Sequence, residues 1–267
     1  MNIGIISDIH IDKNQAYPIT ELLAQKSWEH ELQCLLIAGD ISNRDTTTLD
    51  FLDRFCEISG IRVYFVPGNH DLWDLSGGCK DTWETYRRYA EHPSCLIDRC
   101  VPLNDQWVVT GQTGWYDYTF GNKKFSPEEF ERCNMYGRTW QDSVHVRWNM
   151  PDPQVHQEMM RRLEKQLVES SGKKRIVLTH MVGIKEFLVP ESREMWDYFN
   201  AFIGSPEYGA LFQKYKVEYS VMGHVHFRTR HTHDKTQYLC SCLNYYTEWQ
   251  SDNAEQEIDE ALTVLTL

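Results

Sequence analysis

Short apolar runs that stop abruptly at polar residues restrict the fold of this chain more than any other feature. The runs are NIGIIS, CLLIAG, RVYFVPG, RIVLT and VEYSVMG, and they end before Asp8, Asp40, Asn69, His180 and His224. Apolar runs of this length are typical of strands buried on both faces, as in sheets that are covered by helices. The chain is therefore predicted to build its core around such strands.

Helical patterns lie between these runs. They cover residues 19–32, 46–59 and 155–170, and Asp45 or Thr46 is expected to cap the second helix. Strand–helix–strand repeats of this kind form right-handed units with parallel strands. An α/β fold is the result.

Two other stretches predict hairpins, with turns at 104–105 and 234–235, so the sheet is expected to be mixed or doubled. The segment at about 115–152 is rich in aromatic residues and interrupted by Gly, Pro and Asn. Since no repeat or linker divides the chain, residues 1–267 are predicted to form a single domain with an insertion at about 115–152.

The charge balance argues against general nucleic-acid binding. The 267 residues carry a formal net charge of -12, whereas phosphate backbones need a basic face. No apolar stretch is as long as a membrane span, and the first residues lack the basic region of a secretory signal. The eight cysteines show no framework spacing, so reduced thiols in a cytoplasmic protein are expected.

The polar residues at the ends of the runs carry metal-binding chemistry. Ligands bind where the carboxyl ends of strands converge, so these side chains are predicted to meet. The set combines carboxylates, an amide and imidazoles: Asp8, His10, Asp40, Asn69, His70, His180, His224 and His226. Such donors suit divalent or trivalent Mn, Fe or Zn. They outnumber the ligands that one ion needs, which predicts two ions sharing a bridging ligand.

In combination, the motifs DIH, GD, GNHD, a histidine after a strand and GHVH resemble those of the calcineurin-like metallophosphoesterase superfamily. The resemblance extends from Asp8 to His226. It implies a four-layer α/β/β/α sandwich with mixed sheets and a dinuclear centre at the strand ends. By the same resemblance, one metal is held by Asp8, His10 and His226. Asp40 bridges the two ions, and the second metal is held by Asn69, His180 and His224.

The resemblance also implies a catalytic role for His70, which lies beside the metals without binding them. Its expected task is to stabilise the phosphoryl oxygens and to protonate the leaving alkoxide after in-line attack by an activated water. Asp71 is expected either to orient and charge this imidazole or to act only as a turn cap. One departure is the segment ISNRD, which has Asn43 where phosphoprotein phosphatases carry an aspartate. The sequence therefore looks closer to phosphodiesterase-like bacterial branches.

Candidate substrate contacts lie in the aromatic-rich segment. Trp115, Tyr116 and Tyr118 follow a predicted strand and could stack on a base or an aryl group, or could equally form a small core under the loop. Arg138 could bind a second phosphate, or could belong to a salt-bridged surface.

The sequence thus predicts a metal-dependent phosphoesterase that acts on a phosphodiester or another small phosphate ester. A nuclease for short nucleic acids is an alternative, and a non-catalytic metal-binding scaffold is another. The sequence predicts neither the physiological substrate nor the oligomeric state.

Overall fold

A sheet with strand order β12-β1-β2-β3 contains the first three predicted strands. The computed structural model describes residues 1–76, 78 and 80–267. The strands are β1 (Asn2–Ile6), β2 (Cys34–Ile37), β3 (Arg62–Phe65) and β12 (Thr263–Thr266). β1, β2 and β3 run parallel, and β12 joins β1 in the antiparallel direction.

A second sheet has the order β10-β11-β9-β8-β5-β4. Its strands are β4 (Cys100–Pro102), β5 (Trp107–Gln112), β8 (Lys174–Thr179), β9 (Tyr219–Met222), β10 (Arg228–His233) and β11 (Thr236–Ser241). Its inner strands are parallel, whereas β4–β5 and β10–β11 are antiparallel hairpins. Both predicted hairpins are therefore confirmed.

The two sheets pack face to face, and alternation along each strand separates the inner core from the outer core. In and just after β2, Cys34, Leu36 and Ala38 pack in the cluster shared with the other sheet, whereas Leu35 and Ile37 pack in the cluster that contains the helices. This is the period-two pattern of a strand that is buried on both faces. The near-continuous apolar runs are the sequence signature of this burial.

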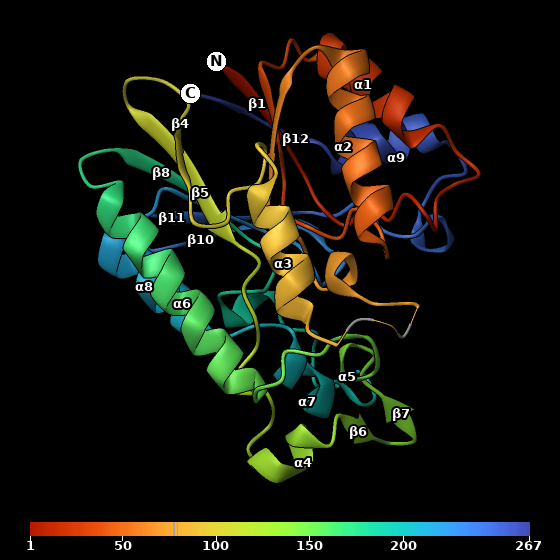
Figure 1. Ribbon diagram of the computed structural model, residues 1–267, viewed down its shortest axis with the longest axis vertical. Coiled ribbons are helices and arrows are strands. Elements are labelled where there is room, and N and C mark those ends of the chain that lie inside the picture. Colours follow the sequence, from red (N-terminus) through yellow and green to blue (C-terminus); the bar gives the residue numbers. More distant parts are fainter. Residues whose placement is uncertain (77, 79) are drawn as a thin grey trace.

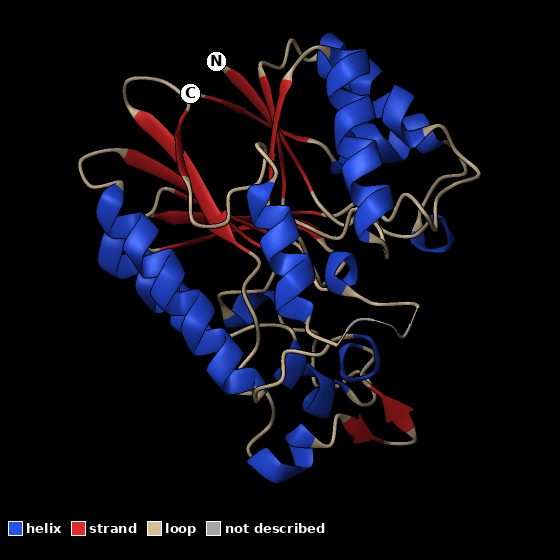
Figure 2. Ribbon diagram, viewed as in Figure 1, coloured by secondary structure: helices blue, strands red, loops and turns tan. Residues whose placement is uncertain are grey.

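Helices cover the outer faces of the two sheets (Figure 1). The first sheet is covered by α1 (Ile19–Glu29), α2 (Asp45–Ser59) and α9 (Ala254–Ala261). The second is covered by α6 (Asp152–Glu169) and α8 (Pro206–Tyr215). The predicted four-layer α/β/β/α sandwich is thus confirmed (Figure 2).

The predicted cap of α2 differs from the structure. The helix begins at Asp45, so its N-cap is Arg44, which provides no side-chain hydrogen bond. The Asp45 carboxylate instead accepts a hydrogen bond from the backbone N–H of Thr46.

Short elements gather at one end of the sandwich (Figure 1). Those of the 115–152 segment are α4 (Pro127–Glu131), β6 (Asn134–Met135), β7 (Arg138–Thr139) and α5 (Asp142–His145). α7 (Trp196–Phe199) lies with them. The remaining short elements are α3 (Thr82–Glu91) and the 3-10 turns His70–Leu72, Lys185–Phe187, Asn200–Phe202 and Tyr246–Glu248. Within the described part of the chain, no helix has the length and apolar character needed to cross a bilayer.

Candidate metal centre

The predicted ligands come together at the carboxyl ends of strands from both sheets. Loops after β1, β2 and β3 supply residues from the first sheet, and loops after β8 and β9 supply residues from the second. The backbone is left-handed at many of these positions, with φ of 50° at Asp8, 43° at His10, 55° at Asp40, 71° at His224 and 57° at His226. These sharp turns point the side chains of successive loops inward.

Glycines let these loops approach one another. A Cβ atom at Gly68 would lie 2.1 Å from Oδ1 of Asp40, and one at Gly223 would lie 2.3 Å from Oδ2 of Asp8. Since real Cβ atoms do not approach oxygen so closely, only glycine fits at these two positions. The glycines that precede the polar clusters therefore allow the carboxylates to be buried.

One half of the centre contains the DIH and GHVH residues. Nε2 of His10 lies 3.3 Å from Nε2 of His226, and Oδ1 of Asp8 lies 3.7 Å from the same His226 nitrogen. Nδ1 of His226 lies 2.7 Å from Oε2 of Glu248, which orients the ring and leaves Nε2 facing the centre. Glu248 was not predicted from the sequence.

The other half is organised around the side-chain oxygen of Asn69. This oxygen lies 2.9 Å from Nε2 of His180 and 2.9 Å from Nδ1 of His224. The Asn69 amide nitrogen donates to Asp142 of α5, which fixes the direction of the oxygen. Nδ1 of His180 donates to the Ala38 carbonyl at 2.7 Å, so Nε2 is the nitrogen that faces the donor set.

Asp40 lies between the two halves. Its Oδ1 accepts a hydrogen bond from the His70 backbone N–H at 2.9 Å. Its Oδ2 lies 3.8 Å from Nε2 of His10 and 3.3 Å from Nε2 of His180. One carboxylate oxygen thus faces an imidazole from each half, as the predicted bridging role of Asp40 requires.

The electrostatics of these side chains fit bound cations. Burial, reinforced by neighbouring imidazoles, lowers the pKa of His10 and that of His224, so both rings are neutral near pH 7. Burial also acts to lower the pKa of His180, but the adjacent Asp40 carboxylate outweighs it and the pKa is raised. Burial opposes it at His226 as well, but the Glu248 and Asp8 carboxylates raise the pKa of that ring, so a metal ion would take the place of a proton at His180 and His226. Imidazoles, carboxylates and an amide oxygen converging at such distances match two divalent metal ions.

His70 lies beside this donor set. Its ring stacks on Trp73 with centroids 3.7 Å apart, and Nδ1 lies 2.6 Å from Oδ1 of Asn43. Its Nε2 lies 3.9 Å from Oδ2 of Asp40. Burial lowers the pKa of this imidazole, and the nearby histidines add to the effect.

The predicted pairing of Asp71 with His70 is wrong. The Asp71 carboxylate instead accepts hydrogen bonds from the backbone N–H groups of Gly68, Ile41 and Ser42 and from the hydroxyl of Thr48. It therefore joins the loops after β2 and β3. These contacts agree with the alternative that Asp71 acts as a turn cap, and they reach beyond a single turn. The partner of the imidazole is Asn43, the position where the sequence departs from phosphoprotein phosphatases.

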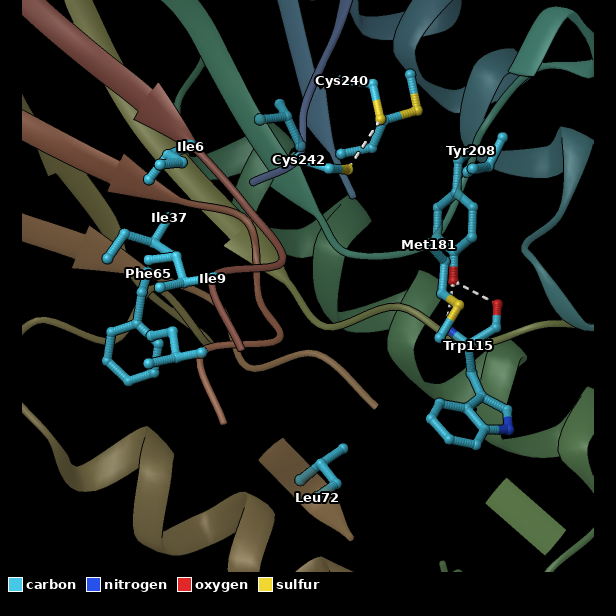
Figure 3. Close-up of a cluster of buried hydrophobic side chains, with 14 of the residues drawn as sticks. Ile6, Ile9, Ile37, Phe65, Leu72, Trp115, Met181, Tyr208, Cys240 and Cys242 are labelled. Carbon is cyan, nitrogen blue, oxygen red and sulfur yellow. Dashed lines mark hydrogen bonds between the residues drawn. The ribbon is translucent and has the colours of Figure 1, made fainter. Parts of the chain in front are cut away.

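The three aromatic candidates for substrate contact lie in the core. Trp115 is fully buried, and Tyr116 and Tyr118 are 1% and 8% exposed. The Trp115 indole N–H and the Tyr118 hydroxyl both donate to Asp152 at the start of α6. Figure 3 shows Trp115 within a cluster of buried side chains beside Met181 and Tyr208. Stacking of these rings on a substrate is thus excluded by burial, and the alternative of a core under the loop holds.

Two cavities adjoin the donor set. One of about 350 Å³ is lined by Asp40, His70 and Trp73 together with Arg138, so Arg138 does lie beside the centre. A larger one of about 740 Å³ is lined by Arg193, Arg228 and Glu248. Both cavities include Trp140, Trp196, His224 and His226 in their walls. The aromatic side chains beside the donor set are therefore Trp140 and Trp196, and not the predicted Trp115, Tyr116 and Tyr118.

A two-sheet sandwich with oxygen and nitrogen donors at its strand ends is the arrangement that the sequence resemblance to metallophosphoesterases implied. Residues 1–228 match the family model described as calcineurin-like phosphoesterase. The chain belongs to this family, which implies divalent metal ions in a dinuclear site.

Comparison with solved structures supports the same fold. The phosphopantetheinyl hydrolase of Mycobacterium tuberculosis is similar with a TM-score of 0.78 and 17% identity, over 93% of this chain and 91% of that one. A dimetal phosphatase from Danio rerio is similar with a TM-score of 0.56 and 11% identity, over 90% of this chain and 86% of that one. A search of curated protein sequences finds no match.

Proposed function

We propose that this protein hydrolyses a phosphodiester or another small phosphate ester at a centre of two Mn, Fe or Zn ions. The observation that carries the proposal is a complete donor set with one further imidazole, that of His70, beside it and facing a cavity. The proposed ligands are those named from the sequence: Asp8, His10, Asp40, Asn69, His180, His224 and His226. Free thiols at the described cysteines support a reducing, cytoplasmic compartment.

The proposed roles follow from the contacts of each side chain. Two divalent ions held in this set would activate a water molecule and bind the phosphate oxygens. His70 donates its Nδ1 proton to Asn43, so Nε2 is directed to the ester. The negative charge of a bound phosphate favours a second proton at Nε2. That proton then passes to the leaving oxygen, while Asn43 holds the ring in position.

The presence of two cavities beside the donor set favours a phosphodiester, which carries an organic group on each of two ester oxygens. The two cavities share His224 and His226 in their walls, so a diester bound at the donor set would have a cavity on either side for its two arms. Arg138 and Arg193 would bind further negative charge on these arms. The similarity to the Mycobacterium tuberculosis hydrolase supports a phosphopantetheinyl ester as the first diester to test.

A comparison of leaving groups tests the role of His70. The His70→Ala variant should lose about 10²–10⁴-fold in kcat on an alkyl ester, whose leaving oxygen needs a proton, and much less on a nitrophenyl ester. Metal content measured by atomic emission should equal that of the wild type. Full activity of this variant on the alkyl ester would contradict the proposed role.

A comparison of substrates tests the reaction class. Metal-stripped protein is reconstituted with Mn, Fe, Zn or Mg and assayed with chromogenic monoesters and diesters and with a phosphopantetheinyl diester. A preference for diesters is expected, and activity on monoesters alone would refute it. Cleavage of short single strands with steep salt dependence would indicate a nuclease instead, and protein purified without metal or turnover would indicate a scaffold.

A further inference from the structure

A histidine outside the dinuclear centre lies buried between two carboxylates. His156 of α6 is 1% exposed. Its Nε2 lies 3.0 Å from Oε2 of Glu207, in the first turn of α8, and 3.8 Å from Oδ2 of Asp117, in the loop after β5. A ligand atom from each of the three residues lies within 4.8 Å of the others.

The opposite ring nitrogen of His156 contacts a backbone carbonyl and a hydroxyl. Nδ1 lies 3.0 Å from the carbonyl oxygen of Trp115, which can only accept a hydrogen bond. The hydroxyl of Tyr208 donates to the same carbonyl at 2.9 Å, and Figure 3 shows it pointing at the Trp115 backbone. Nδ1 also lies 3.1 Å from that hydroxyl, so a neutral ring has two arrangements: Nδ1–H donates to Trp115, or Nδ1 accepts from Tyr208 while Nε2–H donates to Glu207. In the first arrangement the Nε2 lone pair faces the two carboxylates, which is repulsive unless a positive charge lies between them.

Hydrogen bonds hold Asp117 as an oriented carboxylate. Its Oδ1 accepts from the backbone N–H and the hydroxyl of Thr119, at 3.0 and 2.6 Å. Its Oδ2 accepts from the hydroxyl of Ser205 at 2.7 Å. Metal ligands are commonly fixed by such outer hydrogen bonds, as is a histidine whose second nitrogen donates to a backbone carbonyl. The side chain of Glu207 is 60% exposed, which leaves a path from solvent.

We propose that Asp117, His156 and Glu207 form a separate metal site for a divalent cation, with Zn²⁺ as the best match. A second proton on His156 would leave one of the two carboxylate charges uncompensated, whereas a divalent ion with a neutral imidazole balances both. One nitrogen and two carboxylate oxygens, with room for water on the exposed side, suit Zn²⁺. None of these residues belongs to the dinuclear set, so the proposal does not rest on the proposed function.

The site would have a structural effect on the dinuclear centre. It joins α6, α8 and the loop after β5, which are far apart in the sequence. The carbonyl of Thr113 in that loop accepts the backbone N–H of His180 at 2.8 Å. An ion at His156 would therefore stabilise the segment beside one of the proposed metal ligands.

Zinc stoichiometry tests the proposal. Metal-stripped full-length protein is titrated with Zn²⁺ and the bound metal is measured after equilibrium dialysis. The wild type should bind three equivalents, and Glu207→Gln should bind the third at least tenfold more weakly. Asp117→Asn should do the same. As a matched control, Glu164→Gln changes a carboxylate of α6 that pairs with Lys214 and should retain three equivalents.

The imidazole ¹⁵N signals of His156 distinguish a metal from a second proton. Saturating Zn²⁺ should shift the Nε2 signal in the wild type but not in Glu207→Gln. Binding of only two equivalents by the wild type would overturn the proposal. So would an imidazolium signal that Zn²⁺ leaves unchanged, because the group would then be a His156–Glu207 ion pair.

Discussion

Replacing Asp71 with asparagine should lower the stability of the fold, by loosening the loops after β2 and β3, rather than change the protonation of His70. The carboxylate is fully buried and accepts from Gly68 N–H at 2.8 Å, Ser42 N–H at 3.1 Å and the Thr48 hydroxyl at 2.6 Å, among others. An amide keeps one oxygen, so its NH₂ group would face backbone N–H donors. Loss of one or two hydrogen bonds to a charged acceptor costs about 1.5–3 kcal/mol each, and a buried unpaired donor adds to this.

The expected loss is therefore about 3–5 kcal/mol of the free energy of unfolding, a large part of the total for a domain. Urea unfolding followed by fluorescence measures it. Asp50→Asn changes an exposed carboxylate of α2 and should stay within about 0.5 kcal/mol of the wild type. Unchanged stability of Asp71→Asn, together with a shifted pH profile of kcat/KM, would refute this reasoning and restore a charge-pairing role.

Three further outcomes are expected. Arg138→Ala should raise the KM for diesters about tenfold with little change in kcat, since Arg138 lines the cavity from the exposed strand β7; an equal loss in kcat would contradict this. Burial raises the pKa of Asp152 to about 6, so its contribution to stability is greatest below pH 4 and is lost as the pH rises through 6. Asp152→Asn should remove about 2 kcal/mol of this pH dependence in urea unfolding compared between pH 4 and pH 7. Removal of the metals with a chelator should lower the Tm, and excess Mn²⁺ should restore it. The corresponding gain in the free energy of unfolding is about 4 kcal/mol per ion at a thousandfold excess over Kd.

The strand-end ligands could be predicted because each is coupled to a local pattern. An apolar run that ends at Asp8, Asp40 or Asn69 gives both the strand and the position of the side chain at its end. Their supporting partners could not be predicted this way. Glu248 and Asp142 come from short helical turns without a marked sequence pattern, and only the tertiary fold brings them to His226 and Asn69.

The aromatic segment after β5 illustrates a different limit. A run of Trp and Tyr has the same composition whether it lines a cavity or fills a core. Burial of Trp115 depends on α6, because Asp152 at its start accepts the indole N–H, and on Tyr208 of α8, which bonds its backbone. Those elements lie tens of residues away, so the local pattern favours neither outcome. The same holds for Asp71, whose partners lie in two different loops.

The left-handed backbone at Asp8, His10, Asp40, His224 and His226 has an evolutionary consequence. This conformation costs a residue with a side chain about 1 kcal/mol relative to glycine. A lineage that stopped hydrolysing its substrate would no longer select for these side chains, and drift would favour glycine wherever the side chain makes no structural hydrogen bond of its own. All five side chains are present in this chain, which counts against the alternative of a non-catalytic metal-binding scaffold. Glycine at these positions would be an early mark of lost catalysis among its relatives.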